Sequence, residues 1–177
     1  VSKKSGVSVA TLTDEVGMIR PTKIERTKEN DEEKIEKTLI ASRFVLNRIL
    51  KGEKFVDISK IKTEWLANDL HKEVFDWAKT MPEHTDLVNP MFSKFGYEND
   101  EINKILNVNM KFADTIREAD YFNDCVLMLA NEFVSKRLEQ VKNGYNELSD
   151  PEAKRASIAE MSRLQKILKS KDINDKL

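Results

Sequence analysis

Hydrophobic positions between residues 120 and 171 have the spacing of two long amphipathic helices. The first set recurs mostly every three or four residues, which places it on one helix face: Phe122, Val126, Leu129, Phe133, Leu138, Val141, Tyr145 and Leu148. A narrower face follows the break at residues 149–152: Ile158, Met161, Leu164 and Leu168. Asp150 is a good N-cap and Pro151 suits the first helical position. The pattern therefore predicts a long helix that folds back into a C-terminal helical hairpin.

The same spacing predicts a bundle of shorter helices earlier in the chain. Expected helices cover residues 31–51, 64–81 and about 85–95, with another after Asn99 and a single turn near residues 57–59. Asn30 or Asp31, Thr63 and Asn99 are the expected N-caps, and Gly52, Pro82 and Gly96 the expected ends. Pro90 allows the third helix to start two residues later. Residues 108–113 are open between loop and helix, and the long helix is expected from Thr115 or Ala119.

These elements predict an all-α fold, with a compact bundle of about five or six helices followed by a long helix and a projecting hairpin. Residues 1–30 have no sustained period and few large hydrophobic side chains, which is typical of a flexible linker. The expected divisions are a linker at residues 1–30, a helical bundle at 31–134 and a hairpin at 135–177. Gly144 is a candidate hinge or an ordinary surface glycine.

Composition agrees with this fold and narrows the function. The 177 residues contain only 5 Gly and 4 Pro, and the net charge is −1. A single cysteine excludes a disulfide framework and a multi-cysteine zinc site, and fits a reducing cytoplasm. The longest apolar run, residues 125–130, is far too short for a membrane span. Residues 57–120 carry thirteen Asp/Glu against eight Lys/Arg, which argues against broad nucleic-acid binding, since that needs a concentrated basic face.

No catalytic, metal or cofactor motif is evident in the sequence. Phosphate-loop and zinc-protease patterns are missing, and five scattered glycines do not build a phosphate cradle. His71 is expected to be a partly buried histidine bonded to the backbone or to a neighbouring helix. The acidic run at residues 98–101 is read as a helix cap with first-turn acids, although carboxylates of this kind can hold Mg²⁺. Cys125 is expected to be a buried, unactivated thiol.

The hairpin is left as the candidate functional surface. Residues 137–171 carry eight Lys/Arg against five Asp/Glu, and apolar side chains rimmed by basic ones suit docking onto a helical partner with an acidic rim. The alternative is that the hairpin folds against its own bundle. The candidate partner-binding residues are Leu138, Val141, Tyr145, Leu148, Ile158, Met161, Arg163, Leu164, Lys166, Ile167 and Leu168.

Residues 31–171 resemble a helical module shared by bacterial replication proteins. The resemblance is carried by the order and spacing of residues 61–66 (IKTEWL), 71–75 (HKEVF) and 85–88 (TDLV). This module is the N-terminal domain of replicative helicases and the C-terminal domain of DNA primases. The polar N-terminal segment, the long helix and the late hairpin look more like the primase version.

The resemblance implies that this chain is the helicase-binding part of a cytoplasmic bacterial primase. Its parent would be an RNA polymerase that makes primers, with zinc-binding and metal-dependent catalytic domains that have no counterpart in these residues. The chain itself would then be monomeric, without enzymatic activity or cofactor, and would dock on the N-terminal domains of the hexameric helicase. The alternatives are the N-terminal domain of the helicase itself, or an unrelated helical adaptor or small all-α enzyme.

Overall fold

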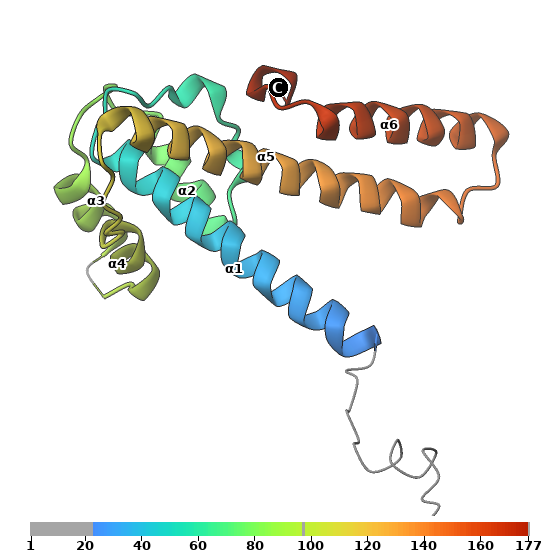
Figure 1. Cartoon of the computed structure of the whole chain (residues 1–177), viewed down its shortest axis with the longest axis horizontal. Coiled ribbons are helices and arrows are strands. Elements are labelled where there is room, and N and C mark those ends of the chain that lie inside the picture. Colours follow the sequence, from blue (N-terminus) through green and yellow to red (C-terminus); the bar gives the residue numbers. More distant parts are fainter. Residues whose placement is uncertain (1–22, 97, 177) are drawn as a thin grey trace, which may run out of the picture. The chain divides into compact units, whose positions relative to one another are not determined.

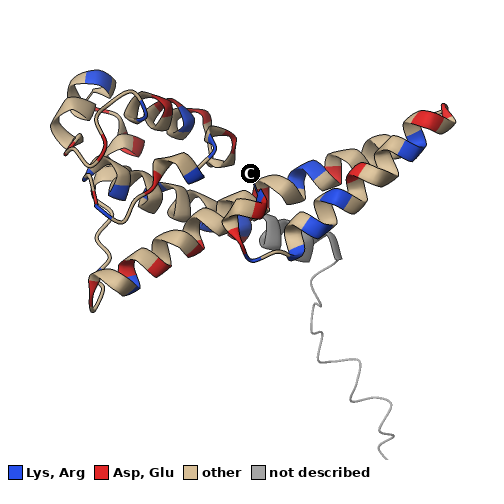
Figure 2. Ribbon diagram, turned by 90° about the horizontal axis from the view of Figure 1, so that it is seen from above, with Lys and Arg blue, Asp and Glu red and all other residues tan. Residues whose placement is uncertain are grey.

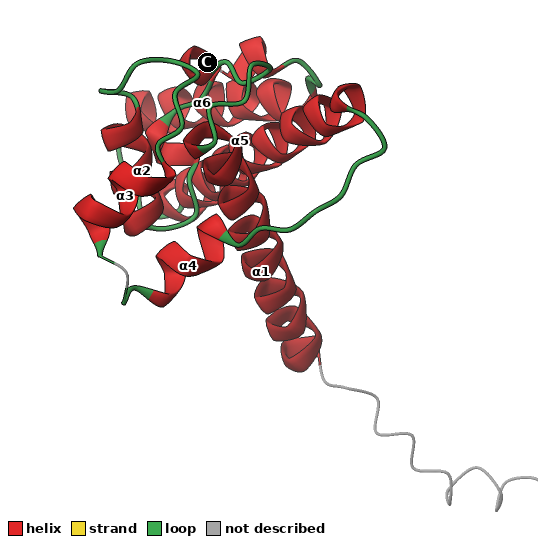
Figure 3. Cartoon of the chain, turned by 90° about the vertical axis from the view of Figure 1, so that its left-hand side faces the viewer, coloured by secondary structure: helices red, strands yellow, loops and turns green. Residues whose placement is uncertain are grey.

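The computed structural model describes residues 23–96 and 98–176, and in these residues every regular element is helical (Figure 1, Figure 3). The all-α prediction is therefore confirmed. The α-helices are α1 (Lys23–Leu50), α2 (Asp69–Ala78), α3 (Val88–Phe95), α4 (Asp100–Leu106), α5 (Thr115–Tyr145) and α6 (Pro151–Lys169). The described residues also contain three 3-10 turns, η2 (Ile58–Lys60), η3 (Thr63–Trp65) and η4 (Ile173–Lys176). The chain packs as two units, residues 1–34 and 35–177, and the core and the hairpin lie in the second.

The first helix begins at Lys23 and not at Asp31, so the predicted linker is wrong for residues 23–30. Neither Gly nor Pro occurs within α1, and Lys, Glu and Arg are strong helix formers. Asn30 and Asp31 therefore continue the helix and do not cap it. The rest of the predicted linker, residues 1–22, lies outside the described residues.

The expected helix over residues 64–81 is also wrong, because it is interrupted at Leu66. The turn η3 ends there in extended backbone, and α2 starts after Asn68, whose side chain accepts the His71 N–H at 2.9 Å. Asparagine often favours such a cap over helix continuation. The Ala67 N–H is held instead by Ser42 Oγ at 3.3 Å. Thr63 makes no cap here; its hydroxyl donates to the Asp76 carboxylate at 2.6 Å.

The remaining helix boundaries follow their local signals. Asn99 caps α4 by accepting the N–H groups of Glu101 and Ile102. Asp114 caps α5 through the Arg117 N–H, so the long helix starts at Thr115 and residues 108–113 are not helical. Asp150 caps α6 with Pro151 at its first position, as predicted. The helix α3 takes the later of its two expected starts, at Val88.

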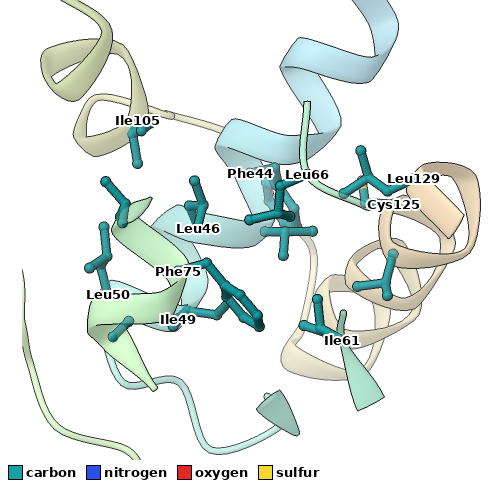
Figure 4. Packing of buried hydrophobic residues seen from close by; sticks show 14 of the residues in the cluster. Phe44, Leu46, Ile49, Leu50, Ile61, Leu66, Phe75, Ile105, Cys125 and Leu129 are labelled. Carbon is teal, nitrogen blue, oxygen red and sulfur yellow. The ribbon is translucent and has the colours of Figure 1, made fainter. Parts of the chain in front are cut away.

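A main hydrophobic core joins α1, η3, α2, α3, α4 and the first half of α5 (Figure 4). Phe44, Leu46 and Leu50 of α1 are fully buried there, with Phe75 of α2 and Leu129 of α5. Full burial of one such side chain contributes about 1.5–3 kcal/mol. The buried residues of this core lie between Ala41 and Ala130, so α5 is held there along its first half.

A second, smaller hydrophobic cluster closes the hairpin. Its buried residues are Val134, Leu138 and Leu164, and Val141, Met161, Ile167 and Leu168 pack partly buried around them. Two side chains expected on the apolar faces lie elsewhere: Phe133 is 40% exposed and Ile158 is 51% exposed. Val134 takes the seam position that Phe133 was expected to fill. Helix α5 runs without interruption through Gly144 to Tyr145.

Candidate functional site

Four polar side chains form a network that links α1, α2 and α4. His71 is fully buried and bridges two helices: its Nδ1 lies 2.7 Å from Ser42 Oγ and its Nε2 lies 2.8 Å from Glu101 Oε1. Arg43 donates to both oxygens of the same carboxylate, at 2.6 Å and 2.7 Å. Such a bidentate guanidinium–carboxylate pair is among the stronger hydrogen-bonded ion pairs. The network therefore fixes the spacing of three helices beside the main core.

The electrostatics of the network fix its proton positions. The bidentate bonds from Arg43 lower the pKa of Glu101 to about 2, so its carboxylate only accepts. Burial lowers the pKa of His71, which is therefore neutral near pH 7. Its Nε2–H must then donate to Glu101, which leaves Nδ1 to accept from the Ser42 hydroxyl. Each member has its partner, as a buried polar network requires.

A serine, a histidine and a carboxylate in a row have the order of a hydrolytic triad, but this geometry does not support one. Ser42 is fully buried and its oxygen also accepts the Ala67 N–H, so no substrate reaches it. The expectation of a histidine bonded to a neighbouring helix is confirmed. The sequence reasoning missed its partners, Ser42 and Glu101, which lie 29 and 30 residues away.

A second buried polar group supports the end of α4 and the start of α5. The Asn47 amide donates to the carbonyl oxygens of Ile105 and Leu106 at 2.9 Å and 3.0 Å. Its own oxygen accepts from Arg48, which also pairs with Glu118 of α5 at 2.6 Å. The Arg48 guanidinium lies over the Phe44 ring, 4.6 Å from its centroid. These contacts are structural, since they satisfy helix-end carbonyls and place a carboxylate and an aromatic ring beside a buried cation.

The hairpin residues predicted to bind a partner differ in how deeply the structure buries them. Leu138 and Leu164 are buried in the seam between α5 and α6, where they close the hairpin. Val141, Met161, Ile167 and Leu168 pack partly buried beside them. Tyr145 and Leu148, near the hairpin turn, are half-buried. The exposed members of the set are Ile158, Arg163 and Lys166.

A stripe of α6, between Ala159 and Ile167, lines a shallow groove. Ala159, Ser162, Arg163, Lys166 and Ile167 line it on one side and Asp175 of η4 on the other, and its volume is about 520 Å³. Arg163 is paired only loosely, with Glu160 at 3.4 Å. Basic residues recur along both helices of the hairpin (Figure 2). This part of α6 thus combines small and apolar side chains with two exposed basic groups.

Cys125 and the acidic side chains are the remaining candidates for chemistry in the described residues. Burial raises the pKa of the Cys125 thiol to about 11, so it is not an activated nucleophile. Among residues 23–96 and 98–176, no three His, Cys, Asp or Glu side chains gather so as to hold a metal ion. Within the same residues, no helix is both long enough and apolar enough to cross a membrane.

Comparisons with known proteins were made with protein-family models, with curated proteins and with solved structures, and none of the three gives a match.

Proposed function

We propose that this chain is a docking module that binds a helical protein through its α5–α6 hairpin. The supporting observation is that the hairpin closes its own narrow seam, separate from the main core. Its outer surface, with Ile158, Arg163 and Lys166, is consequently left to solvent. An exposed apolar side chain and exposed basic ones on the same helix are common features of a surface that recognises helical, acidic partners.

The proposed partner is the N-terminal domain of a bacterial replicative helicase, and the proposed parent is a DNA primase. The order of helices and the residues that carry the resemblance support this assignment. Ile61, Trp65, Leu66, His71 and Phe75 are all buried, so the resemblance rests on residues that build the core. In this proposal the fragment has no catalytic role; it places primer synthesis at the replication fork in the bacterial cytoplasm.

Complex formation tests the proposal directly. The chain is mixed with the replicative helicase encoded in the same genome, and the mixture is analysed by gel filtration with light scattering. We expect a complex that elutes ahead of the helicase hexamer and contains both proteins. Separate elution of the two proteins at concentrations well above the micromolar range would refute the assignment of this partner.

Charge reversal on α6 is expected to weaken that complex. Arg163→Glu combined with Lys166→Glu should lower the affinity by about tenfold or more, which corresponds to about 1.4 kcal/mol or more. Both side chains are exposed and lie outside the seam, so the fold should be kept. The matched control is Lys51→Glu with Lys54→Glu, the same change of charge at two exposed bundle residues. Equal affinity of the two double variants would exclude a specific role of the α6 stripe.

Affinity is also expected to fall with added salt. The hairpin is net basic, and mobile ions screen exposed charges beyond a Debye length of about 10 Å at 0.1 M salt. A titration followed by calorimetry at several salt concentrations measures this dependence. A flat response would show that charge attraction contributes little to binding.

A further inference from the structure

Beyond the last helix, the chain folds back onto the bundle. Ser170 ends α6, and residues 170–176 then lead into η4, where Ile173 packs against the main core. Ile173 lies beside Phe122 and Val126 of α5 and Ile61 of the η2–η3 connection, at a cavity of about 140 Å³. We call residues 170–176 the clip. The middle of the clip is thus attached to the bundle and not to the hairpin.

The C-terminal end of the clip holds α6. Lys176 is only 5% exposed, and its ammonium group donates to the carbonyl oxygen of Ile167 in the last turn of α6. A cation there satisfies a helix-end carbonyl and complements the negative end of the helix dipole. The Ser170 hydroxyl donates to Asp175 and its oxygen accepts the Asp172 N–H. The clip is therefore folded by its own polar contacts.

Without the clip, the hairpin would be joined to the bundle mainly by one helix. The main core ends on α5 at Ala130 and the seam cluster begins at Val134, and α6 packs chiefly on α5. A single helix crossing between two clusters bends and twists more freely than one held at a second point. We infer that the clip is a latch that sets the orientation of the α5–α6 hairpin relative to the bundle, and that its release frees the hairpin to move.

The packing around the clip suits a latch that opens. Ile173 also borders a second hollow, of about 430 Å³, in addition to the cavity at Phe122. This hollow is lined by Asn123, Asp124 and Leu127 of α5 together with Lys171 and Asp172. Ile173 is accordingly held on only part of its surface, so detaching it loses less apolar contact than removing a fully enclosed residue. Asp175 also forms one wall of the α6 groove. A partner seated in that groove would touch the latch itself.

Distance measurements on the free chain test the latch independently of any partner. Spin labels are placed by Lys62→Cys in the bundle and Glu147→Cys at the hairpin turn, both exposed, in a Cys125→Ala background. We expect one narrow distance distribution for the parent, and a broad or shifted one for Ile173→Ala and for Lys176→Met. The control Lys171→Met removes the same charge from an exposed clip residue and should keep the parent distribution.

Two outcomes would overturn the inference. One is a narrow, unshifted distribution in both Ile173→Ala and Lys176→Met, and the other is a parent distribution as broad as theirs. Circular dichroism checks that each variant keeps the helical content of the parent. Lys176 is not part of the main core, so Lys176→Met remains decisive if Ile173→Ala perturbs the bundle.

Discussion

Replacing Gly52 with alanine should destabilise the bundle by about 2–5 kcal/mol, from left-handed backbone strain and overpacking together. Gly52 ends α1 with φ +68°, and a Cβ built there would lie 2.7 Å from the backbone carbonyl carbon of His84. His84 itself has a positive φ of 55°. The segment that follows it is bonded to the end of α1, because the Leu87 N–H donates to the Leu50 carbonyl oxygen at 2.7 Å. The backbone at Gly52 and the backbone at His84 therefore have little room to shift apart. Urea unfolding followed by circular dichroism measures the loss.

Gly144 provides the matched control for that substitution. It lies inside α5, and a Cβ there would meet nothing within 4 Å. Gly144→Ala should consequently stabilise the chain by about 0.5–1 kcal/mol, the difference in helix propensity. Equal effects of the two substitutions would contradict the assigned roles of the two glycines.

Glu101→Gln should cost about 1.5–3 kcal/mol at pH 7, because it removes the charged acceptor of three hydrogen bonds. Arg43 and the fully buried His71 both donate to this carboxylate. An amide of the same shape cannot accept from all three donors at once. Asp100→Asn is the control, since Asp100 is a neighbouring but largely exposed acid on the same helix, and it should change the free energy of unfolding far less.

The difference in the free energy of unfolding between the parent and Glu101→Gln should depend on pH. The pKa of Glu101 is about 2 in the folded chain and near its ordinary value of 4.5 when unfolded. A lowered carboxyl pKa stabilises the fold above the unfolded value, and this contribution is lost as pH falls from about 4.5 towards 2. The difference in the free energy of unfolding should therefore shrink as the pH falls through that range. A difference that persists unchanged at pH 2–3 would contradict an ionised Glu101 in the network.

His71 should make the stability of the fold depend on pH in a second range, above the range in which Glu101 titrates. Its pKa is lowered by burial, so below its ordinary value of about 6.5 the unfolded chain takes up a proton that the folded chain resists. The parent should therefore lose stability from about pH 6.5 downwards, before Glu101 begins to titrate.

Local signals at helix ends allowed much of the fold to be predicted from the sequence. Asn99, Asp150 with Pro151, and Gly52 act through atoms within three residues of themselves, so their roles are legible in the sequence. The prediction from local signals failed at Asn30 and Asp31. Both are residue types that cap helices well, but here they lie in a run of strong helix formers and continue α1. The prediction also failed at Leu66, where tertiary bonding of the Ala67 N–H to Ser42 competes with the helix.

At the candidate sites, less could be predicted from the sequence than at the helix ends. Periodicity assigned Leu138 and Leu164 to the correct faces, yet it does not distinguish a seam side chain from one that meets a partner. It also does not choose between neighbours such as Phe133 and Val134, whose burial depends on where α6 lies. The pairing of His71 with Glu101, and the attachment of Lys176 to α6, depend on the folded chain. Neither contact can be predicted from the pattern of neighbouring residues in the sequence.

Hydrogen exchange of the chain, alone and with the helicase encoded in the same genome, tests the docking proposal most directly. The proposal predicts that binding slows exchange in α6 and in the hairpin half of α5. Amides near Ile158, Arg163 and Lys166 should be the most protected, while the core of α1 and α2 stays unchanged. Protection confined to the bundle surface, or no protection at saturating helicase, would contradict a hairpin that serves as the docking surface.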